Sequence, residues 1–318
     1  MTLMKNTFGN AVSMTIFGES HGPAVGAVLD GLAAGLPVDE AAVAAAMDCR
    51  RARGDGLSTA RTEADEVEFL SGVYQGKTTG TALTLMIRNQ NTRSGDYAKT
   101  QDLLRPGHAD YTAYAKYEGY QDARGGGHFS GRITAASVAA GAVCEGVLQS
   151  LGVRVYTHIA ACGGVQDAPL SSAAGLLLPE PEPGHFALLD PEKEAAMQQA
   201  IREAGAQGDS VGGILETVVT GLPAGVGEPW FDSVESELSH LMFAIPACKG
   251  VEFGAGFAFA DMRGSEANDA FTMQNGVVRT ATNRNGGVNG GITNGMPLVF
   301  RTVIKPTPSI YKQQHTVD

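Results

Sequence analysis

Residues 12–28, VSMTIF-GESHGP-AVGAV, are the most informative segment of the sequence about its architecture. Apolar side chains alternate with polar or small ones along residues 12–17 and again along residues 24–28, which predicts two strands. The segment between them contains glycine and proline, so a turn is expected there rather than the start of a helix. This order of strand, turn and strand argues against a strand–helix unit at the beginning of the chain.

The rest of the chain mixes strands and helices without a regular alternation. Apolar segments predict further strands at residues 66–70, 81–87, 153–160, 214–219, 251–259 and 298–304. Helices are predicted after an entry at residues 37–39 and at residues 109–117, 133–151, 192–204 and 231–243. Polar residues 88–99 and proline-rich residues 166–191 are expected to form a loop and a surface excursion. The pattern is typical of the α+β class, here a layered β-α-β sandwich of mixed or antiparallel sheets and helices, and without a clear linker we predict one domain over residues 1–318.

Composition and charge argue against several classes of function. The net charge of −11 at pH 7 argues against general nucleic-acid binding. We find no apolar run near the roughly 20 residues that span a bilayer and no secretory signal, so a cytoplasmic protein without a membrane partner is expected. The four cysteines are far apart and form no CxxC pair, which predicts reduced thiols and no metal site.

Three short motifs suggest other chemistry but fail on spacing or context. GVYQGKT at residues 72–78 has three residues between its glycines, where a phosphate-binding loop needs four. GGGHFS at residues 125–130 has serine where the dinucleotide-binding fingerprint needs its third glycine. GxSxG occurs at residues 18–22 and 208–212, but neither match is predicted to lie between a strand and a helix, as a nucleophile elbow must. A serine hydrolase therefore remains only as the alternative enzyme class.

Arginine and histidine gather in the glycine-rich segments at residues 49–61, 105–110 and 124–132. An acidic protein that places guanidinium groups in loops is expected to bind an anion, because their forked donors match phosphate and carboxylate. His21 and His108 lie beside glycines, and histidine suits proton transfer near neutral pH, although a lone loop histidine is more often structural. His158 falls in a predicted strand and is interpreted as a core or face residue.

Taken together, the motifs occur in an order that resembles the chorismate synthase family. The matching segments are FGESHG (17–22), LSGV (70–73), GKTTGT (76–81), RPGHAD (105–110), RGGG (124–127), DSVGG (209–213), KGVEFG (249–254), GSE (264–266) and KPT (305–307). No single segment is specific, but their order extends along nearly the whole chain.

The resemblance implies a lyase of the shikimate pathway of aromatic amino-acid biosynthesis. Its small phosphorylated substrate would be 5-enolpyruvylshikimate 3-phosphate, which loses phosphate in a 1,4-elimination to give chorismate. The family requires reduced FMN (FMNH2) without net oxidation or reduction. No added domain for flavin reduction is recognisable, so we expect an external flavin-reducing system linked to NADP. The family also implies a homotetramer.

The resemblance further implies roles for individual residues. His21 corresponds to a general acid that assists phosphate departure, and His108 to a residue that protonates the reduced flavin near N1. The substrate-binding candidates are Ser20, Arg50, Arg53, Arg124 and Arg132. The FMN-contact positions are His128, Phe129, Ser130, Pro246, Ala247, Gly290, Lys305, Pro306, Thr307, Pro308 and Ser309. The sequence departs from the family where His128 replaces an arginine found in many members, and in the spacing around Arg53.

Members of the family continue beyond the point where this sequence ends, with a segment that carries an arginine-histidine-aspartate motif. Residues 315–318 do not reproduce that motif, so we expect the sequence to lack the family's C-terminal segment. The alternative of a different class is a non-catalytic flavin-binding protein, which would bind flavin tightly without turning over the phosphorylated substrate.

Overall fold

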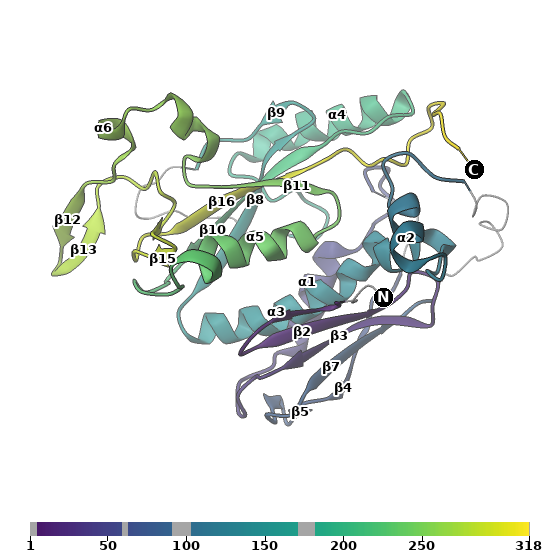
Figure 1. The fold of residues 1–318 in the computed structure, drawn as a ribbon, viewed down its shortest axis with the longest axis horizontal. Helices are drawn as coiled ribbons and strands as arrows, with labels where there is room; N and C mark the ends of the chain where they lie inside the picture. Colours follow the sequence, from purple (N-terminus) through teal and green to yellow (C-terminus); the bar gives the residue numbers. More distant parts are fainter. Residues whose placement is uncertain (1–4, 59–62, 91–102, 171–181, 318) are drawn as a thin grey trace. The chain divides into compact units, whose positions relative to one another are not determined.

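The computed structural model describes residues 5–58, 63–90, 103–170 and 182–317, and its contacts divide the chain into two compact units. Unit 1 comprises Met1–Val147 with Pro308–Asp318, and unit 2 comprises Leu148–Thr307. Figure 1 shows the elements of both units, which are described separately below. That the chain behaves as one domain stays a prediction, because cooperative unfolding is a property that contacts alone do not measure.

Unit 1 contains a five-stranded sheet in the order β1-β2-β3-β7-β4, with every pairing antiparallel. The strands are β1 (Thr7–Gly9), β2 (Ser13–Gly18), β3 (Ala24–Asp30), β4 (Val67–Ser71) and β7 (Leu83–Arg88). The predicted turn between β2 and β3 is confirmed, with Gly18 paired with Val25. At Gly18 the backbone has φ of 101°, and a Cβ there would lie 2.3 Å from a carbonyl oxygen, so only glycine fits.

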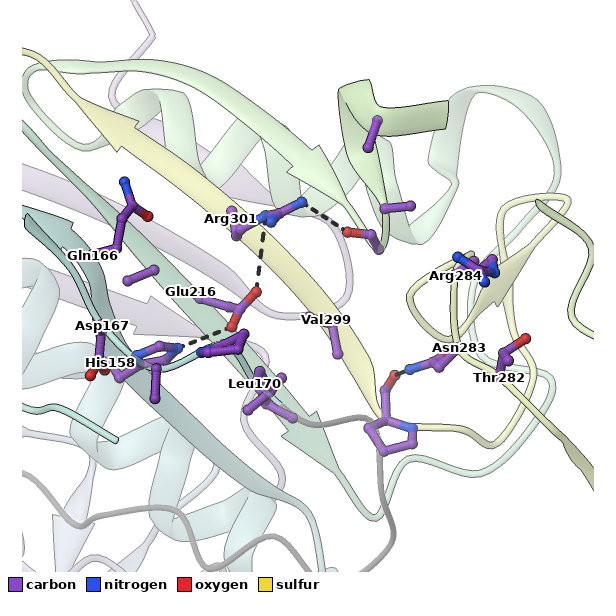
Figure 2. Close-up of a pocket in the computed structure, with 18 of the residues that line it drawn as sticks. His158, Gln166, Asp167, Leu170, Glu216, Thr282, Asn283, Arg284, Val299 and Arg301 are labelled. Carbon is purple, nitrogen blue, oxygen red and sulfur yellow. Dashed lines mark hydrogen bonds and ion pairs between the residues drawn. The ribbon is translucent and has the colours of Figure 1, made fainter. Parts of the chain in front are cut away.

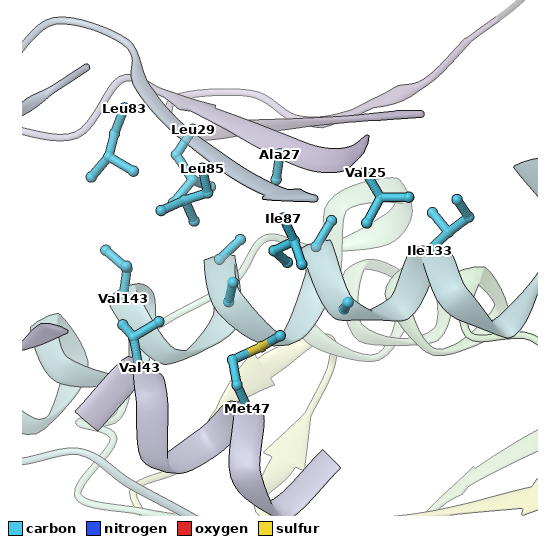
Figure 3. Close-up of a cluster of buried hydrophobic side chains, with 14 of the residues drawn as sticks. Val25, Ala27, Leu29, Val43, Met47, Leu83, Leu85, Ile87, Ile133 and Val143 are labelled. Atoms are coloured by element: carbon cyan, nitrogen blue, oxygen red, sulfur yellow. The ribbon is translucent and has the colours of Figure 1, made fainter. Parts of the chain in front are cut away.

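Two helices build the core of unit 1 beneath this sheet. They are α1 (Glu40–Arg50), capped by Asp39, and α3 (Thr134–Ser150). In Figure 3, Leu83, Leu85 and Ile87 of the sheet point towards α3, while α1 contributes Val43 and Met47 from the other side of that helix. The buried face of α3 is largely alanine, and these small side chains allow close packing of the layers.

The prediction that no apolar run approaches membrane-spanning length needs correction. The helical segment Gly131–Ser150 has 20 residues and is apolar enough by composition to cross a bilayer. The buried alanines of α3 belong to the hydrophobic core of unit 1, and a core helix can pass the same test of length and composition as a spanning one. The polar residues that interrupt this helix in the sequence had hidden its overall apolar character.

The remaining elements of unit 1 are short. They are the hairpin strands β5 (Val73–Tyr74) and β6 (Lys77–Thr78), helix α2 (Asp110–Tyr117), and the 3₁₀ segments η2 (Arg124–Phe129) and η3 (Gly131–Ile133). The hairpin occupies the stretch that resembled a phosphate-binding loop. Its two turn residues, Gln75 and Gly76, have φ of 50° and 71°, which is typical of a tight hairpin turn and supports the rejection of that motif.

Unit 2 contains a second five-stranded antiparallel sheet, in the order β11-β16-β10-β8-β9. Its strands are β8 (Arg154–Cys162), β9 (Val165–Gln166), β10 (Gly213–Thr220), β11 (Cys248–Phe253) and β16 (Leu298–Ile304). Val219, Leu298 and Phe300 form the core on one face, against Leu238 and Met242 of α5 (Val234–Ala244). The α+β prediction, with its antiparallel sheets and helices, is confirmed.

The peripheral elements of unit 2 show where the sequence-based predictions were wrong. These elements are η4 (Pro191–Lys193), α4 (Glu194–Ala206), η5 (Trp230–Asp232), η6 (Gly256–Asp261), α6 (Gly264–Ala267), β12 (Phe271–Gln274), β13 (Val277–Thr280), β14 (Val288–Asn289) and β15 (Ile292–Thr293). The strand predicted over residues 251–259 ends at Phe253, because Gly254 and Gly256 both take positive φ and η6 follows. The β12–β13 hairpin was missed although its Asn-Gly turn is the usual signal.

Candidate active site

The first element of the candidate site is the turn at residues 19–22, which joins β2 to β3 in unit 1. It carries Ser20, which is 1% exposed, and His21. The backbone N–H of Ser20 donates to the carbonyl of Gly127 over 3.0 Å, and that of Gly22 donates to the carbonyl of Glu19 over 3.1 Å. The turn is therefore attached to the triple-glycine segment, which is distant in the sequence.

The triple-glycine segment supports the His21 ring. A Cβ at position 125 would lie 2.2 Å from Cε1 of His21, and φ at Gly125 is 57°. At Gly127 a Cβ would lie 2.0 Å from the carbonyl oxygen of Asp122, with φ of 51°. Both positions need glycine because any side chain would displace the atoms packed there. The clustered glycines thus let the backbone approach the His21 ring closely.

Beside this segment lies an ion pair between Asp122 and Arg124. Both guanidinium nitrogens Nε and Nη2 of Arg124 donate to the carboxylate, over 2.9 and 2.8 Å. These hydrogen bonds, and the nearby charge of His21, hold the pKa of Asp122 below its usual range although burial opposes them. The side chain of Arg124 is half exposed, and its predicted contact with the substrate stays a prediction.

Two other predicted anion-binding residues, Arg50 and Arg132, share the buried carboxylate of Asp65. Arg50 Nη1 contacts one oxygen over 2.7 Å, and Arg132 Nη1 contacts the other. The Arg132 side chain is 5% exposed, and its Nε donates to Asn89 over 2.8 Å. In this arrangement Arg132 stabilises the interior of unit 1, while Arg50 is 21% exposed and also donates to the carbonyl of Gly131.

His108 lies in a second loop of unit 1, between the arginine and the aspartate of an ion pair. Arg105 donates to both carboxylate oxygens of Asp110 over 2.8 Å. Burial raises the pKa of Asp110, but the hydrogen bonds and charge of Arg105, with the charge of His108, outweigh burial and lower it. His108 Nε2 lies 3.1 Å from Oγ of Ser309, one of the predicted flavin contacts. The structure therefore brings together two residues predicted from opposite ends of the sequence.

The predicted flavin triplet at residues 128–130 has several contacts within unit 1. His128 Nδ1 lies 2.7 Å from the carbonyl oxygen of Gly18, and so it braces the end of β2. Phe129 is 41% exposed and packs edge-on against Tyr117. Oγ of Ser130 accepts a hydrogen bond from the backbone of Arg132 and caps η3. Of these three side chains, the Phe129 ring offers the most accessible surface for an aromatic ligand.

The other predicted flavin contacts lie in unit 2, apart from Pro308 and Ser309. The backbone N–H of Lys305 donates to the carbonyl of Ala247 over 3.0 Å, which joins the pair Pro246 and Ala247 to the end of β16. The hydroxyl of Ser210 donates to the carbonyl of Thr307 over 2.7 Å. Pro306 lies against Gly212, where a Cβ would come within 3.1 Å of the proline ring.

Two predicted residues remain peripheral to these contacts. Gly290 lies in the turn of the β14–β15 hairpin with open space around it. Arg53 donates from Nη2 to the backbone carbonyl of Asp48 over 3.3 Å, and no hydrogen bond of this side chain to another predicted site residue is seen in the described ranges.

Unit 2 also has a pocket of about 550 Å³ on the sheet face away from α5. Figure 2 shows a row of charged side chains along its floor, contributed by neighbouring strands. His158 pairs with Glu216 in the strand register, Glu216 with Arg301, and Arg301 with Glu252. Asp167 extends the row on the other side of His158. Charge alternates along this row when the histidine is protonated.

The histidine in this row is buried between two carboxylates. His158 Nδ1 lies 2.8 Å from Asp167 and Nε2 lies 3.0 Å from Glu216. Burial lowers the pKa of His158, but these hydrogen bonds and charges outweigh it, and the pKa is raised. The interpretation of His158 as a core or face residue is confirmed, because the residue is 3% exposed.

Sequence reasoning missed the polar partners that hold the predicted residues. Asp65, Asn89, Asp110 and Asp122 each contact a predicted arginine or histidine segment. Asp110 follows His108 in the RPGHAD motif, and Asp122 precedes Arg124 by two residues, so local spacing could have suggested both. Nothing in the local sequence marks Asp65 or Asn89, because their partners are distant along the chain.

Fold and site together define an α+β protein with antiparallel sheets, in which glycine-rich loops hold histidines beside paired arginines and aspartates. A sequence profile described as chorismate synthase matches residues 12–318. Chorismate synthase of Methanocella arvoryzae is 48% identical over 313 residues, covering 98% of this chain and 83% of that protein. Chorismate synthase of Methanosarcina mazei is 46% identical over 313 residues, with coverage of 98% and 85%.

A solved structure supports the same assignment. A crystal structure of chorismate synthase superposes with a TM-score of 0.75 and 30% sequence identity, covering 94% of this chain and 85% of that one. The chain belongs to the chorismate synthase family.

Proposed function

We propose that this protein is a carbon–oxygen lyase that converts 5-enolpyruvylshikimate 3-phosphate to chorismate and phosphate with the help of reduced FMN. The observation that carries the proposal is the packing of His21 on the triple-glycine segment, beside the Asp122–Arg124 pair. Family membership supports the reaction, and this geometry supports its proton donor.

The elimination breaks the bond between the ring carbon and the phosphate oxygen and a C–H bond at the 1,4-related carbon. The C–H electron pair moves into the ring double bonds, and the proton lost from the ring is balanced by the one that the phosphate receives. His21 is proposed to donate a proton to the departing phosphate, which lowers the charge that develops on it. Arg50 and Arg124 are partly exposed and would neutralise the phosphate or carboxylates of the substrate. Arg132 and Ser20 are buried, so we expect them to support these groups rather than to contact the substrate directly.

The residues present fit a flavin phosphate and an aromatic ring. In unit 2, Lys305 and Thr307 supply a cation and a hydroxyl that suit a phosphate group. In unit 1, taken by itself, Ser309 supplies a hydroxyl and Phe129 supplies an accessible ring. Reduced FMN, when bound, would supply electron density to the elimination without net oxidation. His108 is proposed to hold a proton at Nε2 near the flavin, oriented by Ser309 over 3.1 Å.

The test is an anaerobic assay of the purified protein with photoreduced FMN and 5-enolpyruvylshikimate 3-phosphate. We expect equal amounts of phosphate and chorismate, followed by phosphate analysis and chorismate absorbance, and none when FMN is omitted or left oxidised. Absence of turnover under reducing conditions overturns the proposal. Tight flavin binding without turnover would instead favour the non-catalytic flavin-binding alternative.

A serine hydrolase is disfavoured by both GxSxG sites. Ser20 is 1% exposed and is followed by β3 rather than a helix. The hydroxyl of Ser210 donates to the carbonyl of Thr307. Ester cleavage without flavin that is lost in Ser20→Ala would revive this alternative, and we expect none.

We further propose that the protein is a cytoplasmic homotetramer, in which each chain unfolds as a single cooperative domain. Its reduced flavin would come from an external NADP-linked system. Symmetric homo-oligomers are common among enzymes. Sedimentation is expected to give a tetramer at micromolar concentration, and a stable monomer would contradict it. Addition of NADPH and FMN without a reductase is expected to give no turnover.

A further inference from the structure

The turn that carries Ser20 and His21 is held at both ends by one side chain. Asn89 follows β7 directly, and its Nδ2 donates to the carbonyl of Glu19 over 3.0 Å and to the carbonyl of Gly22 over 2.8 Å. The backbone N–H of Asn89 donates to the carbonyl of Pro23 over 3.1 Å. Three hydrogen bonds from one residue therefore span the whole turn between β2 and β3.

The orientation of the Asn89 amide is set by its neighbour. Arg132 Nε donates to Oδ1 of Asn89 over 2.8 Å. A guanidinium group only donates, so the amide oxygen must face Arg132, and both N–H groups are left for the two carbonyls of the turn. Arg132 is itself fixed by Asp65, whose other oxygen binds Arg50. A connected polar network thus runs from a buried ion pair to the His21 turn.

His21 has a rigid surface on its other side. The ring packs against Gly125, where even a methyl group would collide with it. The N–H of Ser20 ties the turn to Gly127. The turn is therefore held from two directions, by Asn89 on its carbonyls and by the triple-glycine segment against the ring.

We propose that Asn89 is a positioning residue for His21, which fixes the ring at the geometry needed for proton donation. The proposal rests on the proposed role of His21 as proton donor. Asn89 acts through the turn and needs no contact with the substrate. Loss of its two N–H donors would release the carbonyls of Glu19 and Gly22 and let the ring move. A displacement of about 1 Å can cost about 10²-fold in rate.

The test is a double-mutant cycle in the anaerobic assay with Asn89→Ala, His21→Ala and the double variant. Asn89→Ala is expected to lower kcat by about 10- to 10²-fold with little change in KM. In the His21→Ala background the same substitution is expected to cost nothing further, because its effect passes through His21. Multiplicative losses, or an unchanged kcat in Asn89→Ala, would overturn the proposal.

Two further variants separate positioning from general loss of structure. Asn89→Asp keeps the side-chain volume and the acceptor for Arg132 but has no donors for the turn, so it should reproduce the kcat loss. Ser71→Ala removes hydrogen bonds to Ala82 (2.8 Å) and Thr84 (3.0 Å) at the opposite end of β7 and should retain wild-type kcat. An Asn89→Asp variant with the thermal stability and the kcat of wild type would also contradict the proposal.

A readout without substrate keeps this inference separate from the proposed function. The ring Cε1–H signal of His21, assigned by its loss in His21→Ala, is followed by NMR as pH is changed. We expect its chemical shift and titration midpoint to change in Asn89→Ala and to stay unchanged in Ser71→Ala. An identical His21 titration in Asn89→Ala and wild type overturns the positioning role, whereas absent turnover with a shifted His21 titration overturns only the proposed function.

Discussion

Each unit of this protein buries one ionisable group between two groups of opposite charge, but with the roles reversed. In unit 1 the carboxylate of Asp65 lies between Arg50 and Arg132. In unit 2 the imidazole of His158 lies between Asp167 and Glu216. Arginine stays charged at every physiological pH, whereas histidine changes its charge near neutrality. The first network is therefore expected to be insensitive to pH around neutrality and the second sensitive.

The two networks also connect to different structural features. From Asp65 the contacts continue through Arg132 and Asn89 to the turn of His21. From His158 they continue along the sheet through Glu216 to Arg301. Burial of charge therefore does not by itself mark a catalytic centre. What a network holds in place decides whether it serves the chemistry or the fold.

The largest effect on stability is expected for Asp65→Asn. The substitution keeps the shape of the side chain and tolerates the backbone at this position, where φ is 54°. It leaves two guanidinium groups without their anion, and breaking a buried pair usually costs about 3–5 kcal/mol. Amide hydrogen exchange should show the loss in β3 and β7. Asp48→Asn, which breaks the exposed pair with Arg51, is the control and is expected to cost under about 1 kcal/mol.

A smaller effect is expected for His158→Gln, because the remaining carboxylates keep other partners. Asp167 accepts backbone N–H groups of Leu189 and Asp190, and Glu216 lies 3.9 Å from Arg301. The loss of stability should appear as faster amide hydrogen exchange in β8 and β10 rather than in unit 1. Equal losses in both units would mean that the two networks are not separate.

The stability of the two networks should depend differently on pH. The pKa of His158 is raised above its usual value of about 6.5. Its contribution to the free energy of unfolding is therefore fully present below about pH 6.5 and is lost as pH rises through the higher folded-state pKa. In wild type, the protection of β8 and β10 amides from hydrogen exchange should therefore fall between neutral and alkaline pH, relative to that of β3 and β7. In His158→Gln this relative fall should disappear, and its persistence would assign it to another group.

The smallest effect on stability, about 1–2 kcal/mol, is expected for Gly125→Ala, because a non-glycine residue must take φ of 57°. Its effect on turnover should be larger, since the new methyl group occupies the place of the His21 ring. Gly164→Ala is the control, with φ of 86° but open space around it. Similar turnover in the two variants would show that the contact with His21 is not important.

The sequence was informative where structure is local. Alternation and turn residues predicted the β2–β3 hairpin, and the family resemblance predicted His21, His108 and the triple-glycine segment. It failed where contacts are long-range, because nothing near Asp65 or Asn89 indicates that the chain folds them against Arg132. The predicted substrate contact of Arg132 came from motif position alone, and its burial could be seen only in the structure.

The proton-donor role of His21 is tested most directly by comparing His21→Ala with His158→Gln in the anaerobic assay for phosphate release. Both substitutions remove a histidine held by a polar network, but only His21 is placed at the proposed chemistry. We predict that His21→Ala loses about 10²–10⁴-fold in kcat, while His158→Gln keeps a kcat close to wild type at pH 7. A near-normal rate in His21→Ala, or a loss of that size in His158→Gln, would contradict it.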